Sequence, residues 1–136
     1  MKKINMFEKK YSITEDFIDE NGHLSEVGYY HYAVQTVWEK SKYLGMDKIY
    51  QKKKVGPIVF DTSIIFKKEI FLNDEITVKM YFINVVEDGR KWTRVNEIYN
   101  SKGEFCAKVD SNGSFMDLIK RKVVSPPKEI YEMFFK

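Results

Sequence analysis

The chain has 136 residues, 43% of them hydrophobic and 15% aromatic, which is enough apolar side chain for one folded domain over residues 1–136 and excludes a disordered segment. Its 23 basic and 20 acidic residues leave a formal net charge of +3. A balance this even, with basic residues spread along the chain, argues against a dedicated nucleic-acid-binding protein.

The cysteine content and the lengths of the apolar runs predict the cellular compartment of the protein. Cys106 is the only cysteine, so no disulfide can form within the chain, which fits a reducing compartment. No run approaches the roughly 18 apolar residues of a membrane-spanning helix, and the amino terminus lacks the apolar segment of a secretory signal. We therefore expect a cytoplasmic protein without a membrane span.

The first part of the chain predicts a strand over residues 7–14, a polar loop and one long helix over residues 25–44. Asn21-Gly22 is a strong turn signal within the loop. Ser25 is a credible N-cap, and Gly45 is placed to end the helix in the left-handed conformation. Steps of three and four residues predict the stripe of this helix that packs on the protein: Val27, Tyr30, Ala33, Val34, Val37, Trp38, Ser41 and Leu44.

The remainder of the chain predicts mainly β structure. Asn73-Asp74 and Asp88-Gly89 supply turns of hairpin length, and Pro126-Pro127 ends the sheet. The order of elements predicts an α+β fold in which an antiparallel sheet packs on one helix in two layers. The expected elements are a basic loop over 46–55, strands over 58–68, 76–82, 92–99 and 104–118, and a short helix over 128–135.

The candidate catalytic side chains lie in the loop before the long helix. Asp19 and His23 place a carboxylate and an imidazole beside the helix start, where the first N–H groups lack partners within the helix. The backbone N–H groups of Ser25, Glu26 and Val27 are therefore natural donors to an oxyanion. Two structural alternatives remain: an Asx-turn for Asp19 and a backbone-bonded loop histidine for His23.

This pattern resembles the hotdog-fold acyl-CoA thioesterases, the group that includes 4-hydroxybenzoyl-CoA thioesterase. The signature is an aspartate, two residues, Gly-His and a helix tyrosine, here Asp19, Gly22-His23 and Tyr29. Later segments also match the family: Phe66 followed by Asn73-Asp74, Phe115-Met116-Asp117-Leu118, Arg121-Lys122 and Pro126-Pro127. Ser25-Glu26 departs from the family, which commonly has two asparagines there, and Asn73 replaces the usual glycine before the aspartate.

The resemblance implies an antiparallel sheet wrapped around one central helix, and hydrolysis of an acyl-CoA or acyl-carrier-protein thioester without a cofactor or metal. Asp19 would be the base or nucleophile, with His23 positioning the carbonyl or water, and Glu26 the favoured oxyanion donor. It also implies a homodimer or homotetramer whose active site lies at the subunit boundary. Candidates for substrate binding, including the CoA phosphates, are Tyr29, Lys67, Lys68, Arg90, Lys91 and Arg94.

Two other functions stay open. A hotdog hydratase or dehydratase would commonly carry a proline beside its histidine, whereas His23 follows Gly22. A non-catalytic thioester-binding module is favoured by the Ser25-Glu26 departure. The sequence lacks the Gly-x-Ser-x-Gly motif of serine hydrolases, a His/Cys pair at metal-binding spacing and a glycine-rich phosphate loop. The identity of the acyl group cannot be derived from these residues.

Overall fold

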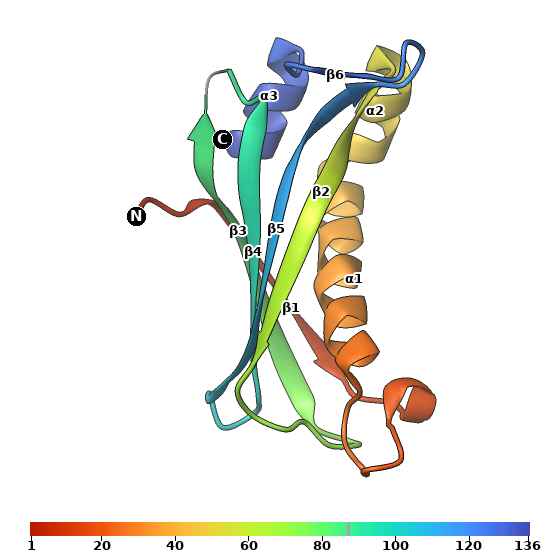
Figure 1. Ribbon diagram of the computed structural model, residues 1–136, viewed down its shortest axis with the longest axis vertical. Coiled ribbons are helices and arrows are strands. Elements are labelled where there is room, and N and C mark those ends of the chain that lie inside the picture. The colour runs from red at the N-terminus through yellow and green to blue at the C-terminus, as the bar shows by residue number, and fades with distance from the viewer. Residues whose placement is uncertain (87) are drawn as a thin grey trace.

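A computed structural model describes residues 1–86 and 88–136. Over these residues the strands form one six-stranded antiparallel sheet in the order β1-β3-β4-β5-β2, with β6 paired to β5. The sheet curves around the long helix α1, as Figure 1 shows, and this confirms the predicted α+β architecture. The elements are β1 (Ile4–Ser12), the 3-10 turn η1 (Glu15–Phe17), α1 (Glu26–Leu44), α2 (Met46–Lys53), β2 (Val55–Phe66), β3 (Glu75–Val86), β4 (Lys91–Tyr99), β5 (Phe105–Asp117), β6 (Lys122–Val124) and α3 (Lys128–Phe135).

The predicted ends of α1 are confirmed. The side chain of Ser25 accepts a hydrogen bond from the Gly28 N–H at 3.2 Å, which satisfies one of the free donors at the helix start. Gly45 ends the helix with φ of 70°, a conformation that favours glycine because it has no Cβ.

The predicted buried stripe of α1 is largely wrong. Ala33 of the predicted stripe is buried, but Val27 and Trp38 are 60% and 69% exposed, and the other buried side chains of α1 are those of Tyr29, Tyr32, Thr36 and Lys40. Polar ends caused the error, because those of Tyr29, Thr36 and Lys40 find hydrogen-bond partners: the Thr36 hydroxyl, for example, donates to the Tyr32 carbonyl at 2.8 Å. The apolar periodicity therefore selected residues on the side of the helix next to β2, and not those on the face that packs on the core.

The segment after α1 was predicted to be a loop and is instead helix α2. Met46, Ile49 and Tyr50 recur at three- and four-residue steps and join a hydrophobic cluster with Phe134 of α3. The lysines of α2 dominate its composition and hid this pattern. They are exposed, and Lys52 and Lys53 lie in the last turn, where cations are favourable. Strand β6 was also not predicted.

The concave side of the sheet holds two hydrophobic clusters within the described residues. One lies under the first half of α1 and packs Tyr29 and Tyr32 on Ile76, Val78 and Ile98. The other is an aromatic cluster at the opposite end of the sheet, where α3 covers it; its rings belong to Phe82, Trp92, Phe115, Phe134 and Phe135. α1 therefore lies between two apolar anchors, which fixes its direction across the sheet.

A buried lysine lies between these anchors. Lys40 is 4% exposed, and its ammonium donates to the Asn5 carbonyl at 2.8 Å. Burial lowers the pKa of Lys40 from 10.5 to about 8, because the charged form loses its hydration. Folding therefore favours release of this proton between about pH 8 and pH 10.5.

We predict a pH signature from Lys40. Since the unfolded chain binds more protons than the folded one in this window, the wild-type free energy of unfolding gains about 2 kcal/mol from Lys40 between pH 7 and about pH 9.5. Lys40→Met lacks this gain. Urea unfolding of both proteins at the two pH values measures it, and subtraction removes every other titrating group. Equal pH dependence in the two proteins would contradict the burial of this cation.

The loop before α1 packs tightly on the helix at Gly28. A Cβ at this position would lie 2.4 Å from Leu24 Cδ1 and 2.9 Å from Phe17 Cβ. Such contacts are not tolerated without movement, so the absence of a side chain at Gly28 lets the loop carrying Asp19 lie against the first turn of α1.

Gly28→Ala should lower the free energy of unfolding by about 1–3 kcal/mol, because overpacking outweighs the gain in helix propensity. Gly56→Ala is the matched control, since a Cβ there meets only Leu118 at 3.7 Å, an ordinary contact distance. Chemical denaturation measures both variants. A Gly28→Ala protein as stable as Gly56→Ala would show that this packing is not as close as described.

Candidate active site at the amino end of α1

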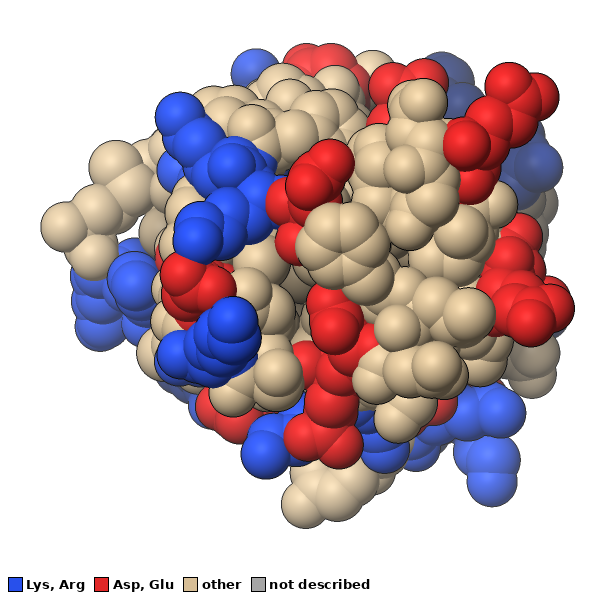
Figure 2. Space-filling view, turned by 90° about the horizontal axis from the view of Figure 1, so that it is seen from below, with Lys and Arg blue, Asp and Glu red and all other residues tan. Residues whose placement is uncertain are grey.

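An open depression of about 610 Å³ lies at the amino end of α1, the lower end in Figure 1. Two segments far apart in the sequence form it: the loop and first turn of α1, and the residues that follow β2. Figure 2 views the molecule from this end and shows acidic side chains across the middle, with basic ones gathered mainly to one side. The depression is lined by Asp19, His23, Leu24, Ser25, Glu26, Val27, Tyr29, Phe66, Lys67, Lys68 and Glu69.

Backbone hydrogen bonds fix the loop that carries the acid and the imidazole. The Asp19 N–H donates to the His23 carbonyl at 3.0 Å, and the Gly22 N–H donates to the Asp19 carbonyl at 3.0 Å. Gly22 has φ of 80°, which the turn requires. The Leu24 N–H donates to the Ile70 carbonyl at 2.7 Å, so the loop is also tied to the segment after β2.

The Asx-turn considered for Asp19 is present. Its Oδ1 atom accepts the Asn21 N–H at 2.9 Å. This bond holds the carboxylate in one orientation, and a carboxylate has further lone pairs on both oxygens. The turn and a chemical role for Asp19 are therefore compatible, because the turn orients the group that lines the depression.

His23 lies next to this carboxylate. Its Nδ1 atom is 3.1 Å from the Leu24 carbonyl oxygen, and its Nε2 atom is 3.9 Å from Asp19 Oδ1. A carbonyl oxygen only accepts, so Nδ1 carries the hydrogen and Nε2 faces the aspartate. At 3.9 Å the two side chains are too far apart for a direct hydrogen bond.

The three predicted oxyanion donors are not equivalent. The Ser25 N–H donates to the Phe17 carbonyl at 2.8 Å, so the prediction of a free amide at Ser25 is wrong. The first amides within the helix belong to Glu26 and Val27, and the carbonyls four residues before them are outside it. Both residues line the depression, and their N–H groups carry the positive end of the helix dipole.

Tyr29 has a positioning role in the site. Its hydroxyl donates to the Lys68 carbonyl at 2.7 Å, and its ring meets Phe66 edge-on at 5.1 Å between centroids. Burial raises the pKa of Tyr29 to about 12, so the hydroxyl keeps its proton as a donor. Tyr29 thus joins the first turn of α1 to the opposite wall of the depression.

The predicted basic residues separate into three groups. Lys67 and Lys68 line the depression, and the Lys68 ammonium pairs with Glu104 at 2.5 Å. Arg90 and Lys91 lie in the β3–β4 hairpin, at the other end of the sheet in Figure 1. Arg94 is 7% exposed beneath α1, and so it is not a surface residue available to CoA phosphates.

Glu39, His31 and Cys106 have structural surroundings. Glu39 pairs with Lys9 at 3.0 Å, and His31 is exposed with its ring 4.4 Å from that of Phe17. Burial raises the pKa of the Cys106 thiol, which makes it a poor nucleophile. Among the described residues no group of histidine, cysteine and carboxylate side chains is arranged to hold a metal ion. In the same part of the chain, no helix has the length and apolarity to cross a membrane.

Sequence reasoning missed the wall formed by Phe66 and Glu69. Phe66 was noted only as a family feature, and Glu69 carried no signal. Their proximity to Asp19 depends on tertiary contacts, namely the bonds from Leu24 to Ile70 and from Tyr29 to Lys68.

Solved structures share this fold. Slr0204, a 1,4-dihydroxy-2-naphthoyl-CoA thioesterase from Synechocystis, is 12% identical, with a TM-score of 0.83 over 96% of each chain. SAV2348 from Staphylococcus aureus, solved in complex with CoA, is 15% identical, with a TM-score of 0.84 over 96% of this chain and 82% of that one. YbaW, a probable thioesterase from Escherichia coli, is 14% identical, with a TM-score of 0.83 over 95% and 98%. These likenesses confirm the predicted hotdog fold.

Comparison of sequences places the chain in a family. A search of the curated proteins finds no match. The profile of the thioesterase-like superfamily matches residues 13–134, which includes the loop, α1 and the strands from β2 to β6. This match agrees with the resemblance drawn from Asp19, Gly22-His23 and Tyr29. The chain therefore belongs to the thioesterase-like superfamily.

Proposed function

We propose that the protein hydrolyses an acyl-CoA or acyl-carrier-protein thioester to the free acid and thiol, with Asp19 as base or nucleophile. One observation supports the proposal: Asp19, Glu26 and Val27 line the same depression, and Glu26 and Val27 are the first two residues of α1. Thioester hydrolysis needs these two elements together, because the attacking group and the developing oxyanion belong to one carbonyl. Structural neighbours include a protein solved with CoA and the gentisyl-coenzyme A thioesterase BH1999.

Each group would have a separate role in the hydrolysis. The thioester carbonyl oxygen accepts from the Glu26 or Val27 N–H, where the helix dipole stabilises negative charge as the tetrahedral intermediate forms. Asp19 either attacks the carbonyl carbon or takes a proton from the water that does. His23 Nε2 faces Asp19 at 3.9 Å and orients that water or the carbonyl. Collapse of the intermediate breaks the C–S bond. In the general-base route the thiolate takes the proton that Asp19 removed from water; in the nucleophilic route the thiolate takes a proton from solvent, and water then hydrolyses the acyl anhydride on Asp19 to the free acid.

We predict that Asp19→Asn lowers kcat for thiol release by about 10²–10⁴, the usual contribution of a positioned acid or base. Asp16→Asn is the matched control: it removes a carboxylate from the same loop that does not line the depression and that accepts from the Thr14 hydroxyl at 3.1 Å. Thiol release from short, medium, long and aromatic acyl-CoAs measures both.

Equal activity of wild type and Asp19→Asn would contradict the role of Asp19. Tight acyl-CoA binding without turnover by the wild type would favour the non-catalytic module instead. The hydrogen bonds of Ser25 favour that alternative, because its side chain accepts from the Gly28 N–H and its own amide donates to the Phe17 carbonyl. Hydration of an enoyl-CoA would favour the hydratase.

We also propose that two copies pair through β2, which ends the strand order and exposes apolar side chains on an unpaired edge. Phe60 and Ile65 are 56% and 50% exposed there. Antiparallel pairing of β2 with its copy would bring the partner's β3–β4 hairpin to the end of the sheet that holds Asp19. Arg90 and Lys91 of that hairpin would then bind CoA phosphates across the subunit boundary.

We propose a cytoplasmic location for this dimer or tetramer, because the free Cys106 thiol fits a reducing compartment.

Phe60→Glu should convert the assembly to a monomer and reduce thiol release, because a charge on the edge strand opposes pairing. Ile119→Glu, at a residue 73% exposed in the β5–β6 turn, is the control and should stay assembled. Light scattering after size-exclusion chromatography gives the mass. A wild-type monomer with full activity would contradict the proposed dimer.

A further inference from the structure

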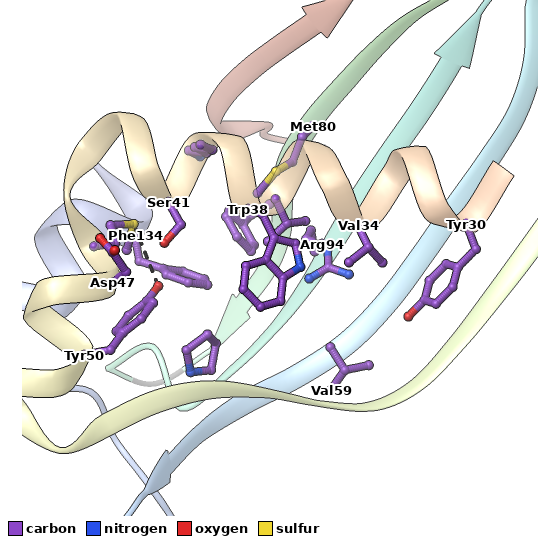
Figure 3. A pocket seen from close by; sticks show the side chains of 15 residues that line it. Tyr30, Val34, Trp38, Ser41, Asp47, Tyr50, Val59, Met80, Arg94 and Phe134 are labelled. Carbon is purple, nitrogen blue, oxygen red and sulfur yellow. Dashed lines mark hydrogen bonds between the residues drawn. The ribbon is translucent and has the colours of Figure 1, made fainter. Parts of the chain in front are cut away.

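A second cavity, of about 400 Å³, lies between α1, α2 and β2, away from the depression at Asp19. No residue lines both. Apolar side chains such as Val34, Trp38 and Met80 form most of its wall. Two cationic side chains also line it, Lys40 and Arg94, which are 4% and 7% exposed. Figure 3 shows the Arg94 guanidinium between Trp38 and Val34.

The buried guanidinium of Arg94 is only partly satisfied. Its Nη2 atom donates to the Ser111 hydroxyl at 3.3 Å, and its Nε atom is buried without a hydrogen-bond partner. Ser111 is itself engaged by Thr62 at 2.9 Å between hydroxyl oxygens. Burial lowers the pKa of Arg94 because the charge has lost its water. A buried guanidinium with free donors is costly unless an anion meets it.

Lys40 adds a second positive charge without a matching carboxylate. Its ammonium donates to the Asn5 carbonyl and lies 5.3 Å from the centroid of the Phe82 ring. Within the described part of the chain, neither Lys40 nor Arg94 forms an ion pair with a carboxylate. Asp47, the acid in the cavity wall, is exposed on α2. The cavity therefore combines an apolar wall with an uncompensated positive charge.

We propose that this cavity binds a carboxylate carried on an apolar body, with the carboxylate at the Arg94 guanidinium and the body against Val34, Trp38 and Met80. A guanidinium fork matches a carboxylate in shape, and the apolar wall excludes a small hydrated anion. The ligand has two possible sources: a free apolar acid, or the distal carboxylate of an acyl group whose thioester lies at Asp19. The second source rests on the function proposed above.

Isothermal titration of the wild type with octanoate and octanamide tests the anion site without any need for activity. The two ligands share an apolar chain, and only octanoate carries the charge. We expect octanoate to bind at least about tenfold more tightly. Arg94→Met should remove most of this preference, whereas Arg121→Met, which deletes an exposed arginine that lines neither cavity, should keep it. Arg94→Met is expected to fold, since an apolar side chain replaces an unpaired buried charge.

Hydrolysis distinguishes the two sources. If the ligand is part of the substrate, wild-type kcat/KM is higher for a carboxyl-terminated acyl-CoA than for the plain acyl-CoA of equal length, and Arg94→Met loses that ratio. If the ligand is a free acid, octanoate binds, and kcat/KM is nearly the same for the carboxyl-terminated and the plain acyl-CoA. Equal binding of octanoate and octanamide by the wild type, together with no such ratio, would overturn the proposal. Failure of all hydrolysis would count against the proposed function and leave the titration result standing.

Discussion

The Leu24 amide donates to the Ile70 carbonyl, and this bond joins the loop before α1 to the segment after β2. The depression at Asp19 depends on it, because one wall comes from the loop and the other from that segment. Two further contacts strengthen the junction: the Tyr29 hydroxyl on the Lys68 carbonyl, and the close packing of Leu24 over Gly28. The amino end of α1 is therefore held against the segment after β2.

Local signals in the sequence predicted the two ends of α1 correctly. Ser25 and Gly45 mark the helix ends because capping depends on a few neighbouring residues. Asp19, Gly22 and His23 were recognisable because the turn that joins them is also local. The sheet followed from alternation along the strands and from the turn residues between them, which are properties of short segments.

Tertiary contacts account for what the sequence left out. The core face of α1 was misjudged since Lys40 and Thr36 are buried where the Asn5 carbonyl and the Tyr11 hydroxyl meet them. Helix α2 was missed because its lysines dominate the local composition. Its apolar residues stabilise the helix by packing on α3, which the local sequence does not show. Arg94 was expected at the surface, and only the register of β4 with its neighbours places it beneath the helix.

The central claim is that one thioester carbonyl meets both Asp19 and the amino end of α1. A crystal structure with an unreactive CoA thioester analogue, in which a methylene replaces the sulfur, tests this most directly. We expect the carbonyl oxygen at about 2.7–3.2 Å from the Glu26 or Val27 nitrogen, with the Asp19 carboxylate facing the carbonyl carbon. A carbonyl bound away from these groups, with Asp19 only holding the Asn21 amide, would contradict it.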